Sequence, residues 1–148
     1  MIYENITIEE LKKLGNFSIF ISADIIGRAV CAVELGIVQK WMGKKSVADF
    51  VNYPDDIKNK IYKVIAILAN GWVMKNSTFT TRSGAIEKQS SPESKVLSGS
   101  ELNKQVSQLR MEARQLLKYT EELVVEQGFP PFEWRREVNV LNLWSQSF

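Results

Sequence analysis

The chain has 148 residues, a length that fits one domain and that can bury a core without disulfides or bound metals. Apolar residues make up 45%, which excludes a disordered chain, and 19 basic against 17 acidic side chains leave a net charge of only +2, which gives no support to a dedicated nucleic-acid binder. The chain begins without the basic and apolar regions of a signal peptide, and charged residues interrupt its most apolar stretch, so we expect neither a leader nor a membrane span.

The first predicted helix covers about residues 8–14. Thr7 and Glu10 form a capping-box pattern, in which the threonine hydroxyl accepts a hydrogen bond from the first turn of the helix. Gly15 follows the last apolar position and is expected to end this helix.

A second, longer helix is predicted over about residues 23–43. Either Ser22 or Asn16 could cap its start, and Gly43 followed by two lysines is typical of a helix end. Small residues recur along it and would let another helix approach closely: Ala23, Gly27, Cys31 and Gly36.

The best-defined helix is predicted over about residues 55–75. Before it, Ser46 begins another capping-box pattern, which predicts a short helix reaching about Asn52. Pro54 and two aspartates then suit the first turn of the long helix, where a missing amide costs nothing and negative charge is favoured. Its apolar residues recur at helical spacing and predict a core face: Ile57, Ile61, Val64, Ile65, Leu68 and Trp72.

Residues 76–99 are rich in Ser, Thr, Gly and Pro, a composition typical of turns and loops. Residues 78–81 and 85–88 could pair as a β-hairpin, and the alternative is a mobile loop. Because a long insertion in a compact domain is usually functional or disordered, we assign Phe79 and Arg82 as candidate partner contacts.

The last predicted helix covers about residues 101–127. Ser98 begins a third capping-box pattern, and Gly128 with two following prolines ends the helix. An apolar stripe along it predicts a second core face: Leu102, Val106, Leu109, Ala113, Leu116, Leu117, Leu123 and Val124.

Residues 129–148 are predicted to form an extended arm that is crowded with aromatic side chains. The arm either folds back onto its own helices or docks on another chain, and we favour docking because tryptophan and arginine are common interface anchors. The partner-binding residues that we assign in it are Phe132, Trp134, Arg135, Arg136, Trp144 and Phe148.

The residue types that most catalytic and metal sites need are missing. The chain has no histidine and one cysteine, which excludes Ser-His and Cys-His catalysis and zinc clusters. It contains no phosphate-binding glycine motif, and its paired acidic residues lie where helix N-termini favour them. We therefore predict that the chain is not an enzyme and uses no metal or cofactor.

The layout of about residues 5–75 resembles the head–tail connector (adaptor) proteins of long-tailed bacteriophages. The similarity lies in three segments: the Thr-Ile-Glu-Glu-Leu opening at residues 7–11, the small-residue helix through Glu34-Leu-Gly-Ile-Val-Gln-Lys-Trp at residues 34–41, and the Pro54-Asp-Asp-Ile start of a core helix that ends near Trp72. The chain departs from the family in its longer last helix and its aromatic tail.

Together, these observations predict a mainly α-helical fold. It is a small bundle over residues 1–128, with a loop or β-hairpin insertion at about 76–99 and an arm over 129–148. The resemblance implies a structural virion protein, assembled in the host cytoplasm. Its copies would form a dodecameric ring between the portal protein and tail or neck proteins, with genomic DNA passing through the lumen without sequence-specific contacts. The alternative is a small regulatory module that binds a protein partner or DNA, for which Lys58, Lys60, Lys63 and Lys75 are the candidate basic group.

Overall fold

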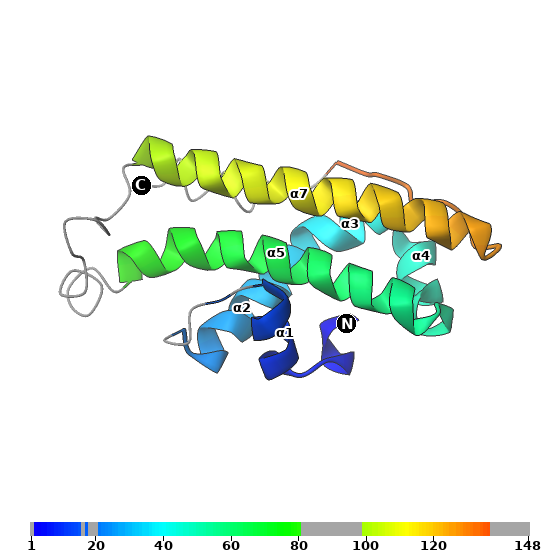
Figure 1. Cartoon of the computed structure of the whole chain (residues 1–148), viewed down its shortest axis with the longest axis horizontal. Helices are drawn as coiled ribbons and strands as arrows, with labels where there is room; N and C mark the ends of the chain where they lie inside the picture. The colour runs from blue at the N-terminus through cyan, green and yellow to red at the C-terminus, as the bar shows by residue number, and fades with distance from the viewer. Residues whose placement is uncertain (1, 16, 18–20, 81–98, 137–148) are drawn as a thin grey trace.

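The computed structural model describes residues 2–15, 17, 21–80 and 99–136, and within these ranges it contains helices and no strand. The central helix, α5 (Asp55–Thr80), runs antiparallel to α7 (Gly99–Glu126) along the length of the molecule (Figure 1). α1 (Ile8–Gly15) and α2 (Ala23–Val33) pack on the other side of α5. The predicted mainly α-helical fold is confirmed for these residues, and none of their helices is both long and apolar enough to cross a membrane.

The N-terminal elements begin where the capping patterns predict. A 3₁₀ turn, η1 (Ile2–Asn5), precedes α1, and the Thr7 hydroxyl accepts a hydrogen bond from the amide of Glu10 at 3.2 Å. Ser22 is the cap of α2, since its hydroxyl accepts from the amide of Ile25 at 3.3 Å. Asn16, the alternative cap, lies outside the described residues.

α2 continues without a break through a π-helical stretch, η2 (Glu34–Val38), into α3 (Gln39–Met42). The predicted helix over 23–43 is therefore found, but the π stretch within it was not predicted. At its start the fully buried Glu34 carboxylate accepts hydrogen bonds from the Ile2 amide at 3.1 Å and from the Gln39 side chain at 2.6 Å. Gly43 then ends the helix with a φ of 87°, a conformation that favours glycine.

The next helix, α4 (Lys44–Asp49), begins two residues before the predicted capping residue. Ser46 is buried within this helix and does not cap it, because the left-handed Gly43 already turns the chain into a new helix at Lys44. A 3₁₀ turn, η3 (Phe50–Asn52), follows and ends where the sequence predicted.

The core faces of the two long helices are those predicted. On α5, Ile57, Ile61, Val64, Ile65 and Leu68 are at most 1% exposed. On α7, the predicted stripe is buried or half-buried, and it packs against α5. α7 ends at a left-handed Gly128, with the amides of Gly128 and Phe129 donating to the carbonyls of Val125 and Val124, which is a complete Schellman motif.

The prediction of a strand over residues 78–81 is wrong for residues 78–80. α5 runs through Thr80, five residues past its predicted end, although serine and threonine have a weak helix propensity. The second predicted strand, the turn before it and Ser98 lie outside the described residues.

Candidate interaction surface

The C-terminal segment, residues 129–136, packs against its own chain and caps α3. The amides of Glu133, Trp134 and Arg135 donate in order to the carbonyls of Met42, Trp41 and Lys40, at 3.2, 2.7 and 3.0 Å. These are the last carbonyls of α3, which have no partner inside the helix. A segment more than ninety positions away in the sequence therefore completes the hydrogen bonding of this helix end.

Glu121 on α7 holds the same segment from the other side. Its Oε2 accepts hydrogen bonds from the Phe132 amide at 2.7 Å and from the Trp134 indole N–H at 3.0 Å. Phe132 is 5% exposed and belongs to the hydrophobic core. Trp134 has a φ of 51°, unusual for a residue other than glycine, and the surrounding hydrogen bonds hold it there.

Aromatic rings and cations stack where the segment meets α3 and α7. The Trp41 and Trp134 rings lie 5.8 Å apart, and the Arg114 guanidinium lies 5.6 and 5.2 Å from their centroids. The Lys118 ammonium lies 5.8 Å from the Trp134 ring. The negative faces of the indoles attract both cations and so concentrate positive charge beside the segment.

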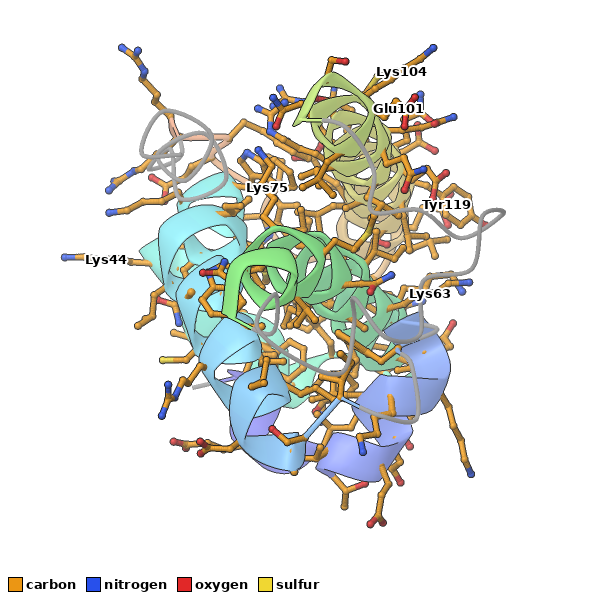
Figure 2. All side chains as sticks on the ribbon, turned by 90° about the vertical axis from the view of Figure 1, so that its left-hand side faces the viewer. Lys44, Lys63, Lys75, Glu101, Lys104 and Tyr119 are labelled. Atoms are coloured by element: carbon orange, nitrogen blue, oxygen red, sulfur yellow. The ribbon has the colours of Figure 1, made fainter. Side chains whose placement is uncertain are left out.

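A groove of about 290 Å³ opens beside this cluster, between α3, α4 and the C-terminal segment. We call it the cationic groove, since its charged lining residues are Lys40, Lys44 and Arg135. Its apolar wall is formed by Leu35, Val47 and Ala48, and Leu35 is 46% exposed. Figure 2 shows Lys44 projecting away from the bundle on the side opposite Lys63.

Glu133 limits the positive charge of the cationic groove. Its carboxylate pairs with the Arg135 guanidinium at 3.1 Å, in an exposed ion pair that contributes little to stability. Its other carboxylate oxygen, Oε2, lies with Cδ and Cγ over Gly43, where a Cβ would collide with them. Gly43 is therefore needed twice: it allows the positive φ of the turn, and it leaves room for the Glu133 side chain of the C-terminal segment.

A second groove, of about 310 Å³, lies between the start of α5, η3 and the N-terminal residues. We call it the acidic groove because Glu10 and Asp55 line it, although Lys58 lies there as well, with its ammonium 5.9 Å from the Phe50 ring centroid. Burial, and then the negative charges of Asp55, Glu10 and Glu34, raise the pKa of Tyr62 in its wall. Val51, at 65% exposed, also lines this groove.

The predicted partner-binding residues have four different outcomes in the structure. Phe132 and Trp134 pack on their own chain, so residues 129–136 fold back onto their own helices, which is the first of the two predicted alternatives. Arg135 lines the cationic groove, and Arg136 is exposed. Phe79 lies within α5, but its side chain is not described. The remaining predicted contacts lie outside the described residues: Arg82, Trp144 and Phe148.

Sequence reasoning missed the α3 and α4 side of the groove. Lys44 is predicted only as part of a helix end, and neither Leu35 nor Val47 is among the predicted partner-binding residues. The available signal was Val47, an apolar residue three positions after Lys44, on a helix too short to bury both of its sides.

The basic group proposed on α5 does not form one surface. Lys75 is 4% exposed and burial lowers its pKa, whereas Lys63 is exposed.

Among the described residues, no cluster of three or more acidic or cysteine side chains could hold a metal ion. Comparisons with protein-family models, with curated proteins and with solved structures found no match.

Proposed function

We propose that this chain is a structural subunit of a bacteriophage head–tail connector, whose copies form a ring between the portal and the tail. The observation that carries the proposal is the cationic groove, a partly apolar binding surface at the edge of a rigid helical frame. The order of elements also supports it, since a Thr7-capped helix, a helix ending near Trp41 and a Pro54-led core helix occur as in that family.

The proposed role is mechanical. α5 and α7 are antiparallel helices of 26 and 28 residues, so the frame is about 40 Å long. Caps at Thr7, Ser22 and Gly128 fix the helix ends, and the C-terminal segment fixes the end of α3. Such a frame keeps its surface side chains at constant positions, which a ring needs if every subunit is to make the same contacts.

Co-assembly with a portal protein tests this function. The chain would be co-expressed with the portal protein encoded in the same genome, and the complex would be imaged by electron microscopy. We expect a ring of this chain on the portal, with the twelve copies that the family resemblance implies. A genome without a portal gene, or a chain that does not co-purify with the portal ring, would contradict the proposal.

One substitution pair adds a surface test. Arg136 is exposed at the end of the described segment, and Lys104 is exposed near the start of α7 (Figure 2). If the arm contacts the portal or a neighbouring subunit, Arg136→Glu should lower portal binding at least about tenfold, since reversing an interface charge brings like charges together. Lys104→Glu is the matched control and should bind as the unchanged chain does.

The alternative function, a DNA-binding module, is favoured by one observation. Lys40, Lys44, Arg114, Lys118 and Arg135 gather around the C-terminal segment. Binding to phosphates through this cluster would fall steeply with salt because counterions are released. Fluorescence anisotropy with a 30-base-pair duplex at 50 and 200 mM salt tests it, and equal binding by the Lys44→Glu variant would contradict it.

A further inference from the structure

A strip of apolar side chains remains exposed along α4 and η3. Val47, Ala48 and Val51 are spaced three and four residues apart, so they share one face of this helical segment. Val47 is half-buried, Ala48 is exposed, and Val51 is 65% exposed, the highest value among the large apolar side chains of the described residues. Val47 packs partly against the core, and beside it Ala48 and Val51 are open to solvent. Adjacent exposed apolar side chains are typical of a contact surface.

The two ends of this strip carry opposite charge. At the α4 start, Val47 and Ala48 share the cationic groove with Lys44 and two further cations. At the η3 end, Val51 shares the acidic groove with Asp55 and with Glu10, whose charges exceed that of the one lysine there. Lys44 precedes Val47 by three positions and Asp55 follows Val51 by four, so the charged ends lie at similar sequence distances from the strip.

We infer that two copies of this chain pair through the α4–η3 strip in an antiparallel, two-fold arrangement. A two-fold contact requires a surface that complements itself. Antiparallel pairing brings the apolar strip of each copy against that of the other, and it places Lys44 of one copy opposite Asp55 of its partner, twice. Parallel pairing would place lysine against lysine and aspartate against aspartate, which is repulsive.

This contact closes after two copies, so it is distinct from the head-to-tail contacts that a ring needs and does not rest on the proposed function. The inference would hold for the free chain even if the portal experiment failed. Conversely, a portal-bound ring would stand even if the free chain were monomeric.

Charge reversal tests the pairing in the full-length chain. Sedimentation velocity should give the unchanged chain a mass of twice 16.9 kDa. Lys44→Glu and Asp55→Lys should each raise the dimer dissociation constant at least about tenfold, because each creates two like-charge contacts per dimer. An equimolar mixture of the two variants should restore the dimer, since each mixed pair again opposes unlike charges at both contacts.

Restoration on mixing also shows that the single variants are folded, because an unfolded chain would not be rescued. Lys63→Glu, on the side of the bundle opposite Lys44, is the matched control and should leave the dimer unchanged (Figure 2). Val51→Asp should weaken the dimer without rescue by either charge variant. A monomeric unchanged chain, an intact Lys44→Glu dimer, no rescue on mixing, or growth of the mixture beyond dimers would each overturn the inference.

Discussion

Ile65 shows at the scale of one residue how helical spacing defines the core. It is fully buried on α5, as its spacing predicts, whereas Lys63 two positions earlier is exposed. Ile65→Ala should lower the free energy of unfolding by about 2–5 kcal/mol, through lost apolar burial and the cavity left behind. Lys63→Ala, the control on the same helix, should change it by less than about 0.5 kcal/mol. Urea denaturation measures both, and an unchanged midpoint for Ile65→Ala would contradict the assignment.

Tyr53 makes stability depend on pH in the alkaline range. Its ring packs edge-on against Phe129, its hydroxyl donates to the Ser46 carbonyl at 3.4 Å, and burial raises its pKa to about 12. The folded-state pKa lies above the ordinary value of about 10. The contribution of Tyr53 to the free energy of unfolding is therefore complete below pH 10 and is lost as pH rises from 10 through 12. The loss for this one group is about 2–3 kcal/mol.

Two phenylalanine variants isolate the effect of Tyr53. Tyr53→Phe removes the ionising group, so its unfolding free energy should fall less steeply between pH 10 and 12 than that of the unchanged chain. Tyr119→Phe, at a tyrosine that is 51% exposed, should follow the unchanged chain. Equal slopes for all three chains, measured by urea denaturation at fixed pH, would show that Tyr53 ionises normally.

Two helix glycines show at the scale of the element that the same substitution can have opposite effects. A Cβ at Gly27, within α2, would meet no atom within 4 Å, so Gly27→Ala should raise stability by about 0.5–1 kcal/mol through helix propensity. A Cβ at Gly15 would lie 2.8 Å from the Ala66 carbonyl oxygen of α5. Gly15→Ala should therefore separate α1 from α5 and lower stability by about 1–3 kcal/mol.

Thermal unfolding of the two variants checks this pair. The run of small residues predicts that another helix approaches closely at Gly27, and the open space around Gly27 shows that this prediction is wrong there. A Gly27→Ala variant less stable than the unchanged chain, or a Gly15→Ala variant more stable than it, would show that the helices pack differently.

At the scale of the whole molecule, residues 132–136 join α3 to α7. They bond to the end of α3 and to α7, and they place Phe132 in the core. A chain ending at residue 131 should therefore be less stable than one ending at residue 136 by at least about 3 kcal/mol, since burial of one phenylalanine alone contributes that much. Comparing the two truncations isolates these five residues.

Full-length Phe132→Ala provides the matched control for that comparison. It should lower the free energy of unfolding by about 3–5 kcal/mol while leaving the backbone bonds to α3 in place. Equal stability of the two truncated chains would mean that the segment is an independent arm, as the docking alternative of the sequence analysis requires.

Local sequence by itself determined which described segments are helical, apart from the start of α4 and the end of α5. Thr7, Ser22 and Gly128 satisfy backbone groups within a few residues, and the apolar spacing of α5 and α7 follows the helical period, so short-range chemistry suffices to predict them. The sequence also predicted Arg135 and Arg136 as binding residues, although for a contact with another chain.

Tertiary structure alone decided the rest. The cap on α3 joins Lys40 to Arg135, and Glu34 accepts from Ile2, which are contacts between residues far apart in the sequence. The π stretch before α4 and the final length of α5 were likewise found only in the structure. Tertiary packing also left Val51 exposed in the wall of the acidic groove. Whether a side chain is buried depends on which distant element covers it, and a local sequence pattern does not show which element that is.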